Sequence, residues 1–254
     1  MLILLPPSEG KAAPTRRGRP VEPDRLSHPE LAEARLTVRD ALIKASGHAD
    51  ALGILGVAPG LAAEVDHNTR LDTMAAQPVS KVYTGVLYDA LAYGTLSTTA
   101  RRRATRSLRV QSALWGPVGP GDRIAPYRLS MAVSLPGIGP LARFWRSRLG
   151  PVLGDLAGTG VVVDCRSSTY TGAWQPAPTA VHRYLAVRVF TEVDGRLVAI
   201  SHQAKHTRGL VARLLLEAPT APRTPAAVTE LVAAEYRCEL TDQGRRGFSL
   251  DVIT

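Results

Sequence analysis

The chain has 254 residues, of which 45% are hydrophobic and 21% are charged, a balance typical of a folded globular protein and not of a disordered, collagenous or coiled-coil chain. Lys and Arg outnumber Asp and Glu by 31 to 22, and this net charge of +9 favours phosphate-bearing partners, although a skew toward arginine is also what a GC-rich genome encodes. Two cysteines exclude a disulfide framework, and neither a membrane span nor a signal peptide is evident, so we expect a cytoplasmic protein with no membrane partner.

The first half of the chain begins with a short apolar run, Leu2–Leu5, which Pro6 and Pro7 end as they would a buried strand. A loop rich in Pro, Gly and Arg follows. The next segments predict, in order, an amphipathic helix over Pro29–Ser46, two short helices over 49–66, an extended segment over Pro78–Tyr83, a helix through Tyr93 and a strand within Ser107–Trp115.

The second half predicts a mixture of hairpin-connected and crossover strands. Asp194-Gly195 is a strong hairpin signal between two extended segments. The predicted elements are a helix over Leu141–Leu156, a strand over Val161–Val163, hairpin strands over Arg183–Thr191 and Leu197–His202, helices over Gly209–Ala218 and Pro225–Ala234, and a closing strand pair over Arg237–Leu240 and Phe248–Ile253. With no repeat and no clear linker, we expect an α+β fold, a single mixed-sheet domain over residues 1–254 with surrounding helices.

Polar residues follow the predicted strand ends, where ligands bind in open mixed sheets. We therefore expect these segments to meet in one polar pocket, although strand ends are also where any sheet returns to water. The candidate pocket residues at these strand ends are Ser8, Lys11, Tyr83, Thr84, Asp164, Ser168, Tyr170 and Ser201, and Tyr127, Arg128 and Arg213 are further candidates for the same pocket. Cys165 lies among them, and a small buried thiol that packs in the core is the favoured interpretation over a nucleophile.

The segment Ser201–Gly209 is polar throughout and runs directly into an apolar helix. Backbone amides at that helix start, with Lys205 and Arg208 beside them, predict an anion site. His202 and His206 are four residues apart, but the sequence supplies no third ligand, so we expect no metal and no cofactor.

Two glycine-containing turns resemble that of a helix–hairpin–helix, in which backbone amides contact a DNA phosphate. One is residues 55–63, where both neighbouring segments are predicted as helices; the DNA interpretation and a plain turn are equally favoured there. The other is residues 135–142, where an extended segment precedes the turn, so a Pro-Gly turn between a strand and a helix is favoured.

Several short segments together resemble the YaaA family of peroxide stress proteins. These segments span most of the chain in the family's order, beginning with Leu2-Ile3-Leu4-Leu5-Pro6-Pro7-Ser8-Glu9-Gly10-Lys11, and continuing through 82–85, 112–116, 125–129, Phe144-Trp145, 164–170 and 201–213. The resemblance implies a mixed α+β domain, a helix–hairpin–helix at about residues 49–66, non-specific binding of double-stranded DNA, and protection against peroxide by limiting iron-dependent damage. It implies no known reaction, and Ala58-Pro59 in the turn departs from the family pattern.

The sequence therefore supports two alternative functions. As a DNA-binding stress protein, the chain would contact phosphates through Gly56, Gly60, Arg101, Arg102, Arg103 and Arg106. The alternative is an enzyme (transferase, hydrolase or ligase) acting on a nucleotide-like or other anionic small molecule. Its candidate catalytic residues are Glu9 as general base, whose pKa burial would raise and the nearby cations would lower, and Lys205 and Arg208 as stabilisers of developing charge, with Tyr83 or Tyr127 donating or orienting a proton.

Overall fold

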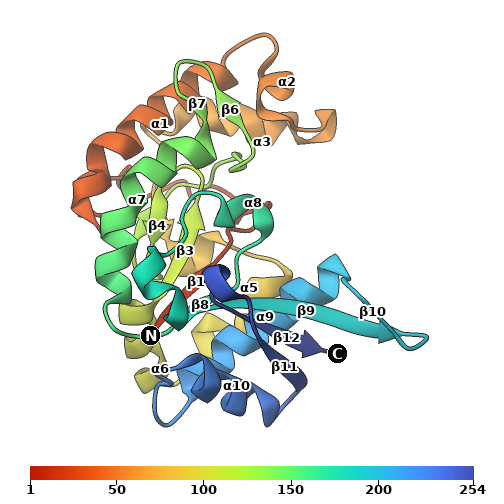
Figure 1. The fold of residues 1–254 in the computed structure, drawn as a ribbon. Coiled ribbons are helices and arrows are strands. Elements are labelled where there is room, and N and C mark those ends of the chain that lie inside the picture. The colour runs from red at the N-terminus through yellow and green to blue at the C-terminus, as the bar shows by residue number, and fades with distance from the viewer.

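The computed structural model describes residues 1–254 and contains an eight-stranded mixed sheet with helices packed around it (Figure 1). The strands follow the order β11-β12-β9-β8-β1-β3-β4, and β10 pairs with β9 outside this path. Their bounds are β1 Leu2–Leu5, β3 Leu108–Ser112, β4 Gly116–Val118, β8 Val162–Asp164, β9 Tyr184–Val193, β10 Arg196–Val198, β11 Arg237–Asp242 and β12 Phe248–Ile253.

The centre of the sheet is parallel and its edges are antiparallel. β12, β9, β8, β1 and β3 run in one direction, whereas β4, β11 and β10 pair antiparallel with their neighbours. A parallel strand is covered on both faces, which is why Leu2–Leu5 is apolar at every position and fully buried. The predicted mixed sheet is confirmed, and it is more parallel than the predicted α+β class implies.

Ten α-helices accompany this sheet. They are α1 Ala32–Ser46, α2 Ala51–Leu55, α3 Ala62–His67, α4 Val79–Val82, α5 Val86–Leu91, α6 Thr98–Ser107, α7 Leu141–Ala157, α8 Ser168–Thr171, α9 Ser201–Glu217 and α10 Pro225–Ala233. Single 3-10 turns occupy Pro23–Arg25, Pro29–Leu31, Pro59–Leu61, Asn68–Arg70, Tyr93–Thr95, Pro178–Arg183 and Gly244–Arg246. Two small ladders complete the fold: β2 Gln77–Pro78 with β5 Arg123–Ile124, and β6 Ser134–Leu135 with β7 Gly139–Pro140.

Three local predictions were wrong. The segment predicted as extended over Pro78–Tyr83 is mostly the single helical turn α4. The second hairpin strand ends at Val198, and helix α9 begins at Ser201 instead of near 209. The sequence predicted this helix only from Gly209, but Gln, Ala, Lys and Arg are good helix formers and no Pro or Gly interrupts the polar run before Gly209.

At the second glycine-containing turn, residues 135–142, the structure has the β6–β7 hairpin leading directly into α7. No helix precedes that turn, which agrees with the favoured interpretation. At residues 55–63 the structure has two short helices, α2 and α3, joined through a turn that begins at Gly56.

Helices α5 and α9 pack unusually closely, and Gly209 permits it. A Cβ atom at this position would overlap the carbonyl oxygen of Leu87 and lie 2.8 Å from the Cβ atom of Ala90. Gly209 therefore brings the first turns of α9, with Lys205 and Arg208, against the start of α5. This contact sets one side of the cavity described below.

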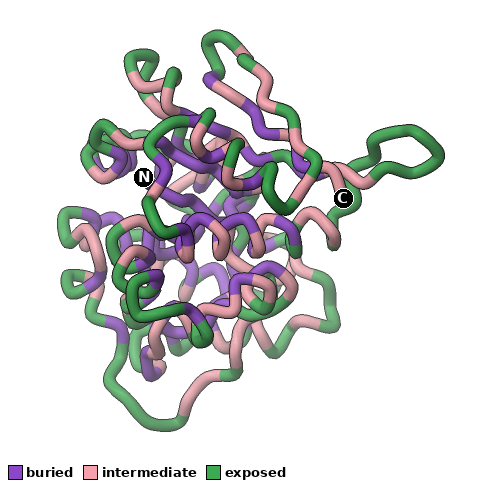
Figure 2. The backbone as a smooth tube through the Cα atoms, turned by 90° about the horizontal axis from the view of Figure 1, so that it is seen from below, coloured by how far each residue is buried: buried purple, intermediate pink, exposed green.

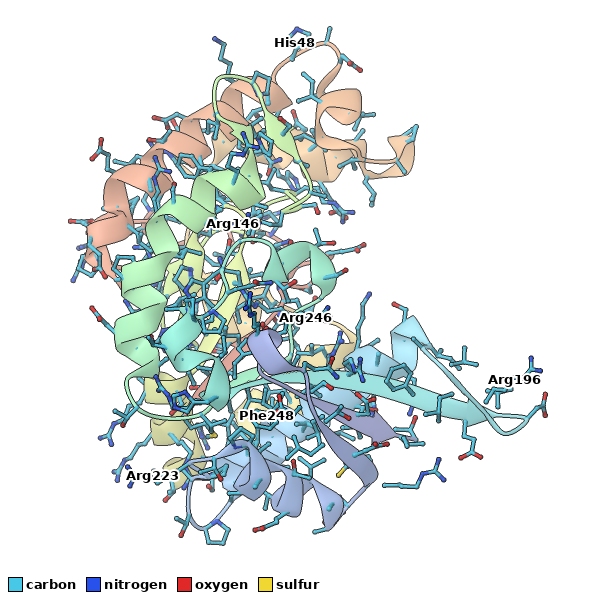
Figure 3. All side chains as sticks on the ribbon, in the orientation of Figure 1. His48, Arg146, Arg196, Arg223, Arg246 and Phe248 are labelled. Atoms are coloured by element: carbon cyan, nitrogen blue, oxygen red, sulfur yellow. The ribbon has the colours of Figure 1, made fainter.

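The β9–β10 hairpin projects from the body of the molecule, and Figure 2 shows its tip as an exposed loop. Arg196 lies near that tip (Figure 3). Four of the five exposed large hydrophobic side chains belong to this segment: Val193, Leu197, Val198 and Ile200. The exposed apolar side chains of this hairpin segment are therefore separate from the buried core.

Candidate functional site

A cavity of about 540 Å³ lies beyond the carboxyl ends of β1 and β8, between the α2–α3 turn and helices α5 and α9. This is the size of a small-molecule site. Of the predicted site residues, the structure brings together Ser8, Glu9, Gly56, Thr84, Arg128, Tyr170, Lys205 and Arg208 on its walls. We call this cavity the cleft.

Arg208 has most of its hydrogen-bonding capacity unused. Its Nη2 donates to the carbonyl oxygen of Val187 at 3.3 Å, while its Nε is buried with no partner. A guanidinium carries five N–H donors, and a desolvated donor without an acceptor is costly. Lys205, one turn earlier on α9, is exposed and makes no hydrogen bond or ion pair. Both residues line the cleft, so their unused donors can bind an anion there.

The predicted anion site at a helix start near residue 209 was wrong in its geometry. Because α9 begins at Ser201, the amides around Lys205 and Arg208 lie inside the helix, where they bond to carbonyl groups of the preceding turn. Only the side chains of these residues are free to bind an anion.

Arg128 bridges two walls of the cleft. Its Nη1 donates to Glu64 Oε2 of α3 and to the carbonyl oxygen of Glu9, both at 3.3 Å, and its Nη2 lies 4.0 Å from Glu9 Oε2. The backbone of Arg128 is held on both sides by the buried amide of Asn68. The side chain of Glu9 is 83% exposed, so the burial expected to activate it as a base is absent.

Lys11 lies behind the loop that carries Ser8 and Glu9. Its Nζ donates to the carbonyl oxygens of these two residues at 3.0 and 3.2 Å and stands 4.2 Å from the ring centroid of Tyr127. Burial, reinforced by the nearby charge of Arg128, lowers the pKa of Lys11 to about 7. A substantial share of Lys11 is therefore a neutral amine near neutral pH.

A chain of buried hydroxyl groups lies beside Lys11. The Oγ of Ser112 accepts from the amides of Leu114 and Trp115, which fills its two lone pairs, so it donates to Tyr127 Oη at 2.7 Å. Tyr127 in turn donates to Tyr83 Oη at 3.0 Å. Burial raises the pKa of both tyrosines, and the proton of Tyr83 is left free to donate.

The turn between α2 and α3 forms the opposite wall. Gly56 adopts the left-handed conformation (φ 62°) that ends α2, and it lines the cleft together with Leu55 and Val57. Gly60 lies further along the turn, is exposed and does not line the cleft. The predicted phosphate-binding turn and the cationic side chains of α9 therefore face the same cavity.

Asp164 does not line the cleft but holds the segment behind it. Its carboxylate accepts from Arg166 Nη2 at 2.6 Å and from Tyr184 Oη at 2.6 Å. Burial opposes ionisation, but the charge and hydrogen bonds of Arg166 outweigh it and lower the pKa of Asp164. Arg166 also donates to the carbonyl oxygens of Tyr170 and Trp174, which fixes the loop that presents Tyr170.

Four further candidates lie away from the cleft surface. Ser168 is flanked by the lining residues Ser167 and Thr169, and Ser201 is the exposed first residue of α9. Arg213 donates to the carbonyl oxygens at the end of α5, so it has a packing role. Cys165 is fully buried, and burial raises the pKa of its thiol to about 12, which fits the favoured core interpretation.

The arginine run predicted to contact DNA lies on α6, far from the α2–α3 turn (Figure 1). Arg103 points inward and donates to the carbonyl oxygens of Leu216 and Ala218 at the end of α9, both at 2.6 Å. Arg101 donates through Nε to the carbonyl oxygen of Leu96. Arg102 and Arg106 are exposed and have no partner.

Sequence reasoning missed much of the cleft lining. The unanticipated residues are Pro6, Pro7, Gly10, Leu55, Val57, Gly85, Val86, Leu87, Tyr88, Leu129, Ser130, Ser167 and Thr169. Most adjoin a predicted residue in the chain, so extending each strand-end segment by two or three residues would have found them.

The structure contains neither a cluster of metal-ligating side chains nor a helix that could span a membrane. No group of three or more His, Cys, Asp and Glu side chains is arranged to hold a metal ion, and His202 and His206 are both exposed on α9. None of the helices has the length and apolar character needed to cross a bilayer.

Comparison with known proteins identifies close relatives over the whole chain. A family model described as peroxide stress protein YaaA matches residues 1–241. A UPF0246 protein of Streptomyces coelicolor is 45% identical over 258 residues, covering 100% of this chain and 98% of its own. A UPF0246 protein of Corynebacterium efficiens is 37% identical over 249 residues, covering 97% of both chains.

Proposed function

The chain belongs to the YaaA family of peroxide stress proteins, and from this premise we propose that it binds duplex DNA without strong sequence preference and thereby limits iron-dependent damage to it. The observation that carries the proposal is Arg208, which lines the cleft, makes one hydrogen bond through Nη2 and has a buried Nε without a partner. A phosphate oxygen is the acceptor that a planar guanidinium binds best.

The surroundings of Arg208 support a phosphate-binding role. The cleft walls carry Arg128, Lys205 and Arg208: Arg128 is paired with Glu64 and lies near Glu9, whereas Lys205 and Arg208 have no carboxylate partner, and the net charge of the whole chain is +9. The Gly56 turn, which resembles that of a helix–hairpin–helix, would add backbone amides on the other wall. Contacts of this kind address the DNA backbone and carry no sequence information.

Fluorescence anisotropy on labelled duplexes of unrelated sequence tests the binding. If the three cleft cations contact phosphates, the logarithm of the affinity falls with the logarithm of the salt concentration with a slope of roughly −2.7. Absence of binding at low salt, or a sharp preference for one sequence, contradicts the proposal. For the protective role, plasmid nicking by ferrous iron and peroxide is expected to slow in the presence of the protein.

A second function, an enzyme acting on a nucleotide-like or other anionic small molecule, is favoured by Lys11 and the hydroxyl chain. A phosphate-binding surface needs neither a buried amine of lowered pKa nor Tyr127 and Tyr83 linked to Ser112. A thermal-shift screen of nucleotides and small acids tests this function. A ligand that stabilises the wild type but not Lys11→Met or Glu9→Gln supports it, and equal stabilisation of all three proteins contradicts it.

A further inference from the structure

The size of the cleft limits what can enter it. Its volume of about 540 Å³ lies in the range of small-molecule sites, so the cavity cannot enclose a DNA duplex. A matched duplex can therefore place a backbone phosphate against the cleft cations but cannot place a base inside the cavity. One nucleotide, by contrast, has the dimensions to occupy it.

The cleft lining divides into two chemical parts. Arg208 and Lys205 on α9 provide the anion-binding part. Pro6, Pro7 and Leu129 provide apolar surface. Flat apolar and aromatic side chains are what an unstacked base packs against, and cations beside them suit its phosphate.

Two residues of the cleft lining, Ser8 and Tyr88, carry hydroxyl groups that are fixed by hydrogen bonds within the protein. Ser8 Oγ accepts from the amide of Thr84 at 3.2 Å and donates to the carbonyl oxygen of Gly10, so its position is set before a ligand binds. The Oη of Tyr88 donates to the carbonyl oxygen of Pro6 at 2.6 Å and holds the apolar wall in place. The cavity is thus preformed by hydrogen bonds within the protein.

We infer that the cleft takes a single unpaired nucleotide of a DNA strand, with its phosphate on Arg208 and Lys205 and its base against Pro6, Pro7 and Leu129. This inference rests on the proposed DNA-binding function and specifies the form of DNA that the same site prefers. Arg128 and the Gly56 turn, on the α3 side of the cleft, are placed to contact the strand where it leaves the cavity. Extruding a paired base costs a few kcal/mol, so a base that is already unpaired binds preferentially.

Anisotropy on three duplexes of about 20 base pairs tests the inference: one fully matched, one with a single bulged adenosine, and one with a bulged abasic residue. The adenosine bulge is expected to bind about tenfold tighter than the matched duplex, since its base is already unpaired and needs no extrusion before it packs against the apolar wall. The abasic bulge has the same backbone distortion without the base, so most of this gain should disappear.

A variant that fills the cavity sharpens the test. Thr169 is exposed on the cleft wall, so Thr169→Trp is expected to remove the preference for the adenosine bulge while the matched duplex still binds. Thr98→Trp, at an exposed position on α6, should keep the preference. If Thr169→Trp does not fold, as judged by its melting temperature, Ser130→Phe fills the same cavity from another wall.

Equal binding of the matched and bulged duplexes overturns the inference and leaves the proposed function intact. Equal binding of the abasic and adenosine bulges also overturns it, because the base would then contribute nothing. Free deoxyadenosine monophosphate that binds as tightly as the adenosine bulge assigns the cleft to a small molecule and overturns it as well. Failure to bind any duplex at low salt contradicts the proposed function itself.

Discussion

The cleft and the α6 surface are both rich in basic residues, yet their cations are used differently. In the cleft, Arg208 has a buried Nε without a partner and Lys205 makes no contact. On α6, Arg103 donates to carbonyl oxygens at the end of α9, and Arg101 donates to Leu96. Two arginines of the α6 run therefore bond to backbone carbonyl groups of the protein and the other two face solvent, whereas the two cations of α9 lie on the wall of a cavity.

The difference shows that a basic run alone is a poor guide to a binding surface. Arg103 ends α9 by satisfying its terminal carbonyl groups, a common role for a basic side chain at a helix C-terminus. Four substitutions, from the largest expected effect to the smallest, test how much residues of the two regions and of the packing around them contribute to the free energy of unfolding.

Asp164→Asn removes the charge that balances Arg166 behind the cleft. Breaking a buried ion pair on one side typically costs about 3–5 kcal/mol, since the remaining charge is buried without a partner. Denaturant unfolding of this variant should show a loss of that size. Asp155→Asn, at an exposed position on α7, is the matched control and should change the free energy of unfolding by less than about 0.5 kcal/mol. Similar small losses for both variants would contradict the assignment.

Gly209→Ala introduces a methyl group that overlaps the carbonyl oxygen of Leu87 and forces α5 and α9 apart. Overpacking of this kind costs about 1–3 kcal/mol. Gly154→Ala is the control, because Gly154 also lies within a helix but has open space around its Cβ position. That change should be neutral or stabilising. Thermal unfolding of the two variants measures the contrast, and a stable Gly209→Ala protein would disprove the close packing.

Lys11→Met tests the lowered pKa of Lys11. The pKa is about 7 in the folded protein and near 10.5 otherwise, so between these values the unfolded chain binds more protons and wild-type stability rises with pH. Relative to Lys11→Met, the wild type should gain up to about 1.4 kcal/mol per pH unit above pH 7, with no further change below it. Urea unfolding from pH 6 to 9 measures the gain, and parallel pH profiles of the two proteins would refute the lowered pKa.

Arg103→Ala should cost about 1 kcal/mol, because carbonyl groups at the end of α9 lose their donors. Arg102→Ala, next to it on α6 and exposed, should change stability by less than about 0.5 kcal/mol. Equal melting temperatures for the two variants would place Arg103 among the solvated arginines.

Much of the fold could be predicted from the sequence, because its hydrophobic pattern and its turn residues favour the elements that the structure contains. Leu2–Leu5 before two prolines, and the Asp194-Gly195 turn, each specify one local structure. The start of α9 could not be placed, since its first turns, residues 201–206, are polar and mostly exposed and carry little hydrophobic periodicity.

Part of the site could also be predicted from the sequence, for a different reason. Strand ends predicted that Ser8 and Thr84 would share a cavity with Lys205 and Arg208. Asp164 ends β8 and Arg213 lies within α9, but both side chains bond to neighbouring groups of the protein and not to the cleft. Whether a polar side chain faces a cavity or a neighbouring carbonyl group depends on tertiary packing, which local sequence does not encode.

The most direct test of the central claim compares two double variants that each remove two positive charges. Lys205→Ala with Arg208→Ala empties the cleft of its free cations, and Arg102→Ala with Arg106→Ala removes the free cations of α6. In duplex binding by anisotropy at one low salt concentration, the cleft variant is expected to lose at least about tenfold in affinity, while the α6 variant stays within about threefold of wild type. Equal losses in the two variants would show that net charge, and not the cleft, determines binding.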